Sequence, residues 1–239
     1  NPKSWMLRFH TQTAGSMLTS QQVDNNVVRV TVQALAAVLG GTQSLHTNSR
    51  DEALSLPGEE SARLALRTQQ VLANECGITD VIDPLGGAPF IEHLTDELEA
   101  TANILIADVE ARGGSVAAIE DGFMQREIHR SAMDWQRAVE SGDQVVIGVN
   151  AFQIDEPRPT IFRPDSSAKD QVLSDLADVR RERDAARVEG TLRSLGETAR
   201  GKGNLMDSIV DCVDSYVTIG EVCHVLEGVF GKYKAPSVL

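Results

Sequence analysis

Three polar side chains near the start of the chain have the spacing of a functional face. Arg8, His10 and Gln12 are two positions apart within residues 6–12, so in an extended strand all three project from one face. Strands of closed parallel barrels are usually apolar on both faces. Burying three such groups without partners would cost about 1–3 kcal/mol for each group. Two interpretations therefore remain open: a face that lines a wet tunnel or polar ligand site, or an exposed edge strand.

A second polar segment follows a pair of glycines and contains Gln43, Asn48 and Glu52. Polar groups at the carboxyl end of a strand lie where α/β folds bind ligands. Asn48 and Glu52 are four positions apart and would share a helical face, where a carboxamide and a carboxylate could bind a ribose diol. The alternative is a helix cap formed by Asn48 with Asp51 in the first turn, and spacing alone favours the cap.

Composition excludes several classes of partner. Among 239 residues, 35 are acidic and 22 basic, which gives a net charge of −13 and argues against a nucleic-acid or anionic-membrane surface. The apolar run 34–39 is too short to span a bilayer, and residues 1–10 do not form a signal peptide. Three cysteines without a C-x-x-C pair predict a cytoplasmic protein with no disulfide framework. Because the first residue is not methionine, we expect a cropped chain.

The first eighty residues alternate between strand and helix patterns. Strands are predicted at 6–12 and 42–47, and amphipathic helices at 27–39 and 61–75. This order is typical of α/β units around a parallel sheet. Two parallel strands cannot bury themselves, and a complete barrel takes about 250 residues. We therefore predict an α/β fold in which residues 1–80 form the last two βα units of a (β/α)8 TIM barrel.

Residues 81–154 are predicted to form a helical extension packed on the barrel. Apolar periodicity predicts helices at 90–112 and 116–140, the second interrupted near Gly122. An isolated apolar run at 145–149 resembles a strand.

The remaining residues are predicted to form a linker and a mainly helical C-terminal region. Residues 155–167 hold three of the eight prolines and are interpreted as the linker. Within 168–239, helices are expected at 170–199, 204–216 and 218–230, the last of which opens with a capping box.

Several short strings, in one order along the chain, resemble the methylmalonyl-CoA mutase family of adenosylcobalamin-dependent acyl-CoA mutases. In chain order they are RFHTQTAG at 8–15, NNVVR at 25–29, GGTQSLHTN at 40–48, DEAL at 51–54, DPLGG at 83–87 and IGVN at 147–150. The resemblance is close over about residues 1–150 and looser across the C-terminal helices.

The resemblance implies a barrel with a polar lumen that holds coenzyme A. By position in the motif, His10 and Gln12 match residues that contact the acyl-CoA thioester, and Gln43 matches another substrate contact. Arg8, on the same predicted face, is included among the substrate-binding residues. The implied reaction is a radical 1,2-migration of the thioester carbonyl group, in which His10 and Gln12 position the migrating group as catalytic residues and do not act as acid or base.

The resemblance also implies adenosylcobalamin as cofactor. Asn48 and Glu52 match groups that hold the adenosyl ribose. The cobalt-ligating D-x-H-x-x-G motif does not occur in the sequence, because His93, His129 and His224 all lack its context. We therefore expect no metal ligand in this chain and a cobalt ligand on another chain or domain.

This pattern resembles the large, substrate-binding subunit of isobutyryl-CoA and 2-hydroxyisobutyryl-CoA mutases. It implies a small cobalamin-binding subunit, a dimer of large subunits and an isolated chain that is inactive. One alternative is the large subunit of a methylmalonyl-CoA mutase. Two others are a non-enzymatic helical interaction protein and an unrelated barrel with His10 as general base.

Overall fold

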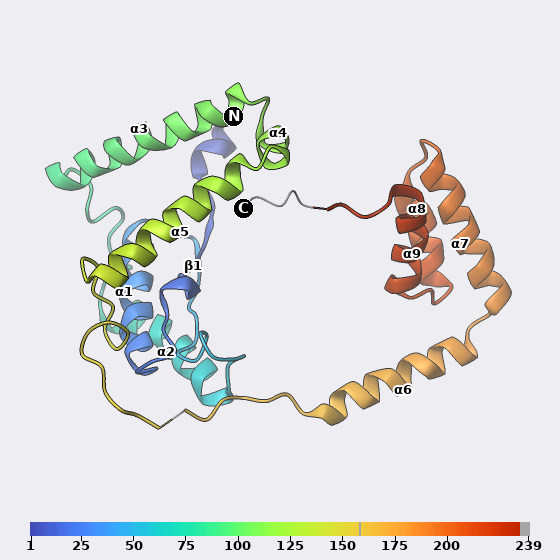
Figure 1. The fold of residues 1–239 in the computed structure, drawn as a ribbon, viewed down its shortest axis with the longest axis horizontal. Helices are drawn as coiled ribbons and strands as arrows, with labels where there is room; N and C mark the ends of the chain where they lie inside the picture. Colours follow the sequence, from blue (N-terminus) through green and yellow to red (C-terminus); the bar gives the residue numbers. More distant parts are fainter. Residues whose placement is uncertain (158, 235–239) are drawn as a thin grey trace. The chain divides into compact units, whose positions relative to one another are not determined.

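The computed structural model describes residues 1–157 and 159–234. They form two compact units, Asn1–Arg163 and a second that begins at Pro164 (Figure 1). Most of the structure is helical, with a small parallel sheet in the first unit, which is consistent with an α/β fold. No helix in the described ranges is long and apolar enough to cross a membrane.

The sheet consists of two short parallel strands, β1 (His10–Gln12) and β2 (Ser44–His46). His10 pairs with Ser44, and Gln12 pairs with His46. These are the only two strands of a sheet among the described residues, so the closed barrel stays a prediction.

The prediction of a strand at 6–12 is wrong for residues 6–9, because the strand begins at His10. Residues Pro2–Met6 form a 3₁₀ helix, η1, and Leu7 adopts a left-handed conformation with φ of 36°. The side chain of Asn1 caps this turn by accepting the Lys3 N–H, and proline is favourable in a first helical turn. The turn ends at Met6, Leu7 is left-handed, and the strand begins only at His10, so Arg8 lies outside the strand.

Two helices follow the strands and contact each other: α1 (Asn25–Leu39) and α2 (Glu59–Glu75). They lie within two residues of the predicted bounds. In α1 the buried residues Asn26, Val30 and Ala34 recur every four positions and form one face. The loop between β1 and α1 includes a short 3₁₀ turn, η2 (Gly15–Met17).

Three helices follow in the first unit and confirm the predicted helical segments: α3 (Pro89–Ala111), α4 (Ser115–Glu120) and α5 (Phe123–Ser141). The break between the last two lies at Gly122, whose φ is 79°. Such a φ is easily adopted only by glycine.

The strand predicted at 145–149 is wrong. This segment forms a turn with one isolated bridge between Ile147 and Ala151. The Asn150 side chain holds the turn, since it accepts the Val146 N–H and donates to the carbonyl of Val139 at 2.7 Å each. Bonds of this kind compete with a sheet ladder.

The second unit is helical and contains α6 (Ser166–Glu182), α7 (Ala185–Arg200), α8 (Leu205–Asp214) and α9 (Ile219–Phe230). The single helix predicted at 170–199 is wrong, because the chain is extended at Arg183 and Asp184 caps a new helix. The predicted capping box of Thr218 and Glu221 is confirmed at the start of α9. Val188, Leu195, Cys212 and Val217 form the core of α7–α9.

Residues 155–157 and 159–165 have no regular secondary structure. The boundary between the two compact units lies in this segment of the chain, after Arg163. The finer division into 1–80, 81–154, 155–167 and 168–239 stays a prediction.

Candidate functional site

The β1–β2 pair carries the predicted substrate-binding side chains. His10 and Gln12 both lie in β1 and are exposed, and the Nδ1 atom of His10 is 2.7 Å from the Ser44 hydroxyl. Arg8 is also exposed, and its guanidinium contacts the sulfur of Met6 at 3.5 Å. Because these three side chains are exposed, the described residues do not enclose them, and the expected tunnel stays a prediction.

Gln43 lies just before β2, and its side chain is bound to backbone groups. Its Oε1 accepts the N–H of Phe9 at 2.7 Å, and its Nε2 donates to the carbonyl of Gly41 at 2.8 Å. Gln43 therefore fixes the beginning of β1 against β2, a role that its position before a strand did not predict.

Gln12 and Asn48 are 36 positions apart and are joined directly. The Gln12 Nε2 donates to the Asn48 Oδ1 at 3.0 Å. Asn48 is 2% exposed, and its Nδ2 has no hydrogen-bond partner among the described residues. A buried donor left unpaired costs about 1–3 kcal/mol, and such groups are normally satisfied by a partner, water or ligand. The Nδ2 therefore marks a place where one of these three acceptors is expected.

Glu52 lies beside Asn48, and both border Gly15. A Cβ atom added to Gly15 would lie 2.9 Å from the Asn48 Nδ2 and 3.6 Å from the Glu52 Oε1. Residues 50–54 form turns and not a helix, so the shared helical face of Asn48 and Glu52 and the helix cap at Asn48 are both wrong. The Asn48 side chain binds Gln12 where a cap would bind the backbone of its own turn.

A buried asparagine from α1 anchors the loop that carries Asn48 and Glu52. Asn26 is fully buried and donates to the carbonyl groups of Thr19 and Arg50, each at 2.8 Å. Its Oδ1 accepts from the Thr19 N–H and from Arg29, so its side chain takes part in four hydrogen bonds. This anchor was missed in the sequence, although its spacing of four from Val30 on an apolar face was a usable signal.

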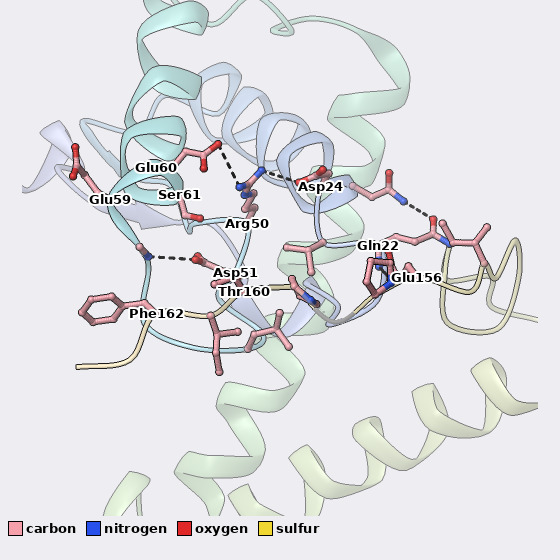
Figure 2. A pocket seen from close by; sticks show the side chains of 18 residues that line it. Gln22, Asp24, Arg50, Asp51, Glu59, Glu60, Ser61, Glu156, Thr160 and Phe162 are labelled. Carbon is pink, nitrogen blue, oxygen red and sulfur yellow. Dashed lines mark hydrogen bonds and ion pairs between the residues drawn. The ribbon is translucent and has the colours of Figure 1, made fainter. Parts of the chain in front are cut away.

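A pocket of about 750 Å³ is lined in part by Arg50 and Asp51 of the same loop (Figure 2). Arg50 extends into it and forms ion pairs with Asp24 at 2.8 Å and Glu60 at 3.5 Å. These carboxylates compensate the positive charge of Arg50, which is the one cationic side chain among the described residues that line the pocket. The predicted substrate and cofactor residues do not line this pocket.

Asp51 also lines this pocket and is buried. Burial acts to raise the pKa of its carboxyl group, but hydrogen bonding to nearby hydroxyl and backbone amide groups, including the Gly58 N–H, outweighs burial and lowers the pKa. Asp51 is thus held as a carboxylate in the turn that precedes α2.

A second pocket of about 710 Å³ lies between α1 and the end of α5, and its lining includes Val28, Val32, Trp135 and Val139. Within the described ranges, no group of three or more histidine, cysteine, aspartate or glutamate side chains could hold a metal ion.

The sequence matches the model of the methylmalonyl-CoA mutase family over residues 1–232. The chain belongs to this family. Its relatives include the 2-hydroxyisobutanoyl-CoA mutase large subunit of Aquincola tertiaricarbonis, which is 42% identical over 241 residues, or 100% of this chain and 43% of that protein.

Methylmalonyl-CoA mutases are equally similar. That of Rhizobium meliloti is 42% identical over 99% of this chain and 34% of that protein, and that of Escherichia coli is 39% identical over 99% and 34%. This member of the methylmalonyl-CoA mutase family thus spans less than half the length of these relatives.

Proposed function

We propose that this chain is part of the large subunit of an adenosylcobalamin-dependent acyl-CoA mutase. The reaction is a radical 1,2-migration of the CoA-thioester carbonyl group, with isobutyryl-CoA or 2-hydroxyisobutyryl-CoA as substrate. The observation that supports the proposal is the direct hydrogen bond between Gln12 and Asn48, because it joins the side chain that the resemblance assigns to the substrate to the one that it assigns to the cofactor. A methylmalonyl-CoA substrate is the alternative, since relatives with both names share 42% identity.

His10 and Gln12 are proposed to orient the thioester from the exposed face of β1. Their side chains lie on the same side of the strand, because they are two positions apart. A ligand that bridges them would be held at two points, which restricts its orientation before the carbonyl group moves. Arg8 and Gln43 are proposed as further substrate contacts, although Gln43 would have to exchange one of its two backbone partners.

Asn48 and Glu52 fit a ribose diol. The unpaired Asn48 Nδ2 can donate to a hydroxyl oxygen, and the Glu52 carboxylate can accept from hydroxyl groups. Adenosylcobalamin, when bound, supplies the carbon radical that starts the migration. Residues of this chain then hold the adenosyl group and the substrate in place and exclude water from both. The cobalt ligand is proposed to come from a small cobalamin-binding subunit.

The fold proposed around this site is a (β/α)8 barrel in which β1 and β2 are neighbouring strands. Their parallel pairing and the helix after each strand agree with two consecutive βα units. A dimer of large subunits is proposed for the assembly.

The test is an assay of the full-length enzyme with its small subunit, with isobutyryl-, 2-hydroxyisobutyryl- and methylmalonyl-CoA, each with and without adenosylcobalamin. We expect cofactor-dependent turnover of one of them. His10→Ala and Gln12→Ala should each lower kcat by about a hundredfold, because small losses of positioning cost that much. Both variants should keep the subunits together in gel filtration. Unchanged turnover of the full complex with either variant would favour a non-enzymatic interaction role for this chain. Turnover without adenosylcobalamin would favour general-base chemistry at His10.

A further inference from the structure

The turn after β1 holds Asn48 through a second hydrogen bond. The Thr13 Oγ1 accepts the backbone N–H of Asn48 at 2.9 Å, and the Thr13 N–H donates to the carbonyl of His46 at 3.0 Å. Thr13 is 4% exposed, so this hydroxyl is shielded from water. The turn is itself fixed to α1, because the Gln33 Oε1 accepts the Ala14 N–H at 2.6 Å.

Gly15 lies close against the Nδ2 end of the Asn48 carboxamide, which is buried. Its φ lies outside the left-handed region, so the backbone would accept alanine there. A Cβ atom at this position would nevertheless lie 2.9 Å from the Asn48 Nδ2, closer than carbon and nitrogen atoms can approach without a shift. The requirement for glycine therefore comes from Asn48 and not from the turn.

We propose that Thr13 and Gly15 are positioning residues for the adenosyl group. Thr13 fixes the backbone of Asn48, Gln12 fixes its Oδ1, and the lack of a side chain at Gly15 lets Nδ2 keep its position. This inference rests on the proposed function, since it assigns to Asn48 a ligand with a ribose diol. It adds that residues which do not touch the cofactor set the affinity for its adenosyl part.

The first experiment compares two cobalamins that differ in the adenosyl group. Adenosylcobalamin and hydroxocobalamin are titrated spectroscopically into the full-length enzyme with its small subunit, and free coenzyme A is titrated by calorimetry. Thr13→Val keeps the shape of the side chain and removes the acceptor. It should raise the Kd for adenosylcobalamin about five- to tenfold, as expected for one lost hydrogen bond, and leave the other two affinities within about twofold. Thr13→Ser, which keeps the hydroxyl, should restore the wild-type Kd.

The second experiment uses Gly15→Ala with Gly58→Ala as a matched control. Gly58 lies in the segment before α2, and a Cβ atom there would meet no atom of the described residues within 4 Å. Gly15→Ala should weaken adenosylcobalamin binding about tenfold or more without lowering the thermal midpoint by more than a few degrees, whereas Gly58→Ala should bind like wild type. Gly15→Ala tests the inference even where Thr13→Val folds poorly.

The inference is overturned when Thr13→Val and Gly15→Ala weaken both cobalamins equally, when neither weakens either of them, or when Thr13→Ser fails to restore binding. A wild-type complex that binds neither cobalamin would instead overturn the proposed function, and this inference with it. The two failures are therefore distinguishable.

Discussion

The two compact units hold their important residues in different ways. In the second unit, α7, α8 and α9 share an apolar core, and Leu195 at its centre is fully buried. In the first unit, the candidate site is joined by hydrogen bonds between distant positions, such as Gln12 with Asn48. A core of neighbouring helices needs mostly local contacts, whereas the polar site exists only when β1 and β2 are in register. The comparison separates a unit held by an apolar helical core from a unit in which hydrogen bonds between distant positions join the residues of the proposed site.

Both units expose apolar surface. In the first unit, Val28 and Val32 of α1 are 64% and 61% exposed, and in the second unit Val213 and Ile219 are 64% and 83% exposed. Exposed apolar surface of this kind is typical of protein contacts.

The largest effect is expected from removing the centre of the helical core. Leu195→Ala should lower the free energy of unfolding by about 2–5 kcal/mol, because it deletes fully buried methyl groups and leaves a cavity. Chemical denaturation followed by circular dichroism measures this change. Ile219→Ala, at a position that is 83% exposed, is the control and should change stability by less than about 0.5 kcal/mol. Equal losses in the free energy of unfolding for Leu195→Ala and Ile219→Ala would show that this core does not stabilise the second unit.

A smaller effect is expected in the first unit from Asn26→Ala. The substitution leaves the Arg50 carbonyl and both backbone groups of Thr19 without this partner, so it should cost about 2–3 kcal/mol. It should also weaken adenosylcobalamin binding, because the loop with Asn48 and Glu52 loses its anchor. Asn25→Ala is the matched control, since the Asn25 side chain donates to Gln22 alone. Similar losses in both variants would show that Asn26 is not the anchor.

The smallest effect concerns an ion pair in the second unit and depends on pH. Arg183 binds both carboxylate oxygens of Glu221, at 2.6 and 2.7 Å, and this pairing lowers the pKa of Glu221 to about 2 from 4.5. Because the folded pKa is depressed, the stabilisation is fully present above pH 4.5 and is lost as the pH falls through about 2. Glu221→Gln should therefore cost about 1–2 kcal/mol at pH 7 and progressively less below pH 4.5.

Denaturation of wild type and Glu221→Gln across this pH range checks the prediction. Glu189→Gln, which affects the exposed pair with Arg193, should cost less than about 0.5 kcal/mol at every pH. A difference between Glu221→Gln and wild type that does not change between pH 7 and pH 2.5 would contradict the assigned pKa.

Much of the fold followed from local sequence signals. The four-residue periodicity of α1 and the capping box before α9 are local features, and both elements lie where they were predicted. The errors arose where a side chain competes with the regular pattern. Asn1 caps a turn that extends to Met6, where a strand was predicted to begin. Asp184 starts a new helix inside a stretch whose amphipathic pattern is continuous.

The members of the candidate site were proposed from the sequence, whereas the contacts between them were not. The sequence indicated Gln12, Asn48 and Glu52 as polar groups at strand ends. It did not indicate that Gln12 binds Asn48, or that Asn26 anchors the loop, because these contacts depend on how segments far apart in the chain come together.

The hydroxyl of Thr13 has a consequence for the alignment of the strands. It receives the Asn48 N–H directly after the rung in which the Thr13 N–H binds His46, so the ladder of the sheet continues into the loop with a side-chain oxygen in place of a carbonyl. A slip of one residue between β1 and β2 would turn Gln12 to the opposite face and separate it from Asn48. The strand pairing therefore fixes the position of the loop, and a misalignment would first disturb the contact between Gln12 and Asn48 in the proposed site.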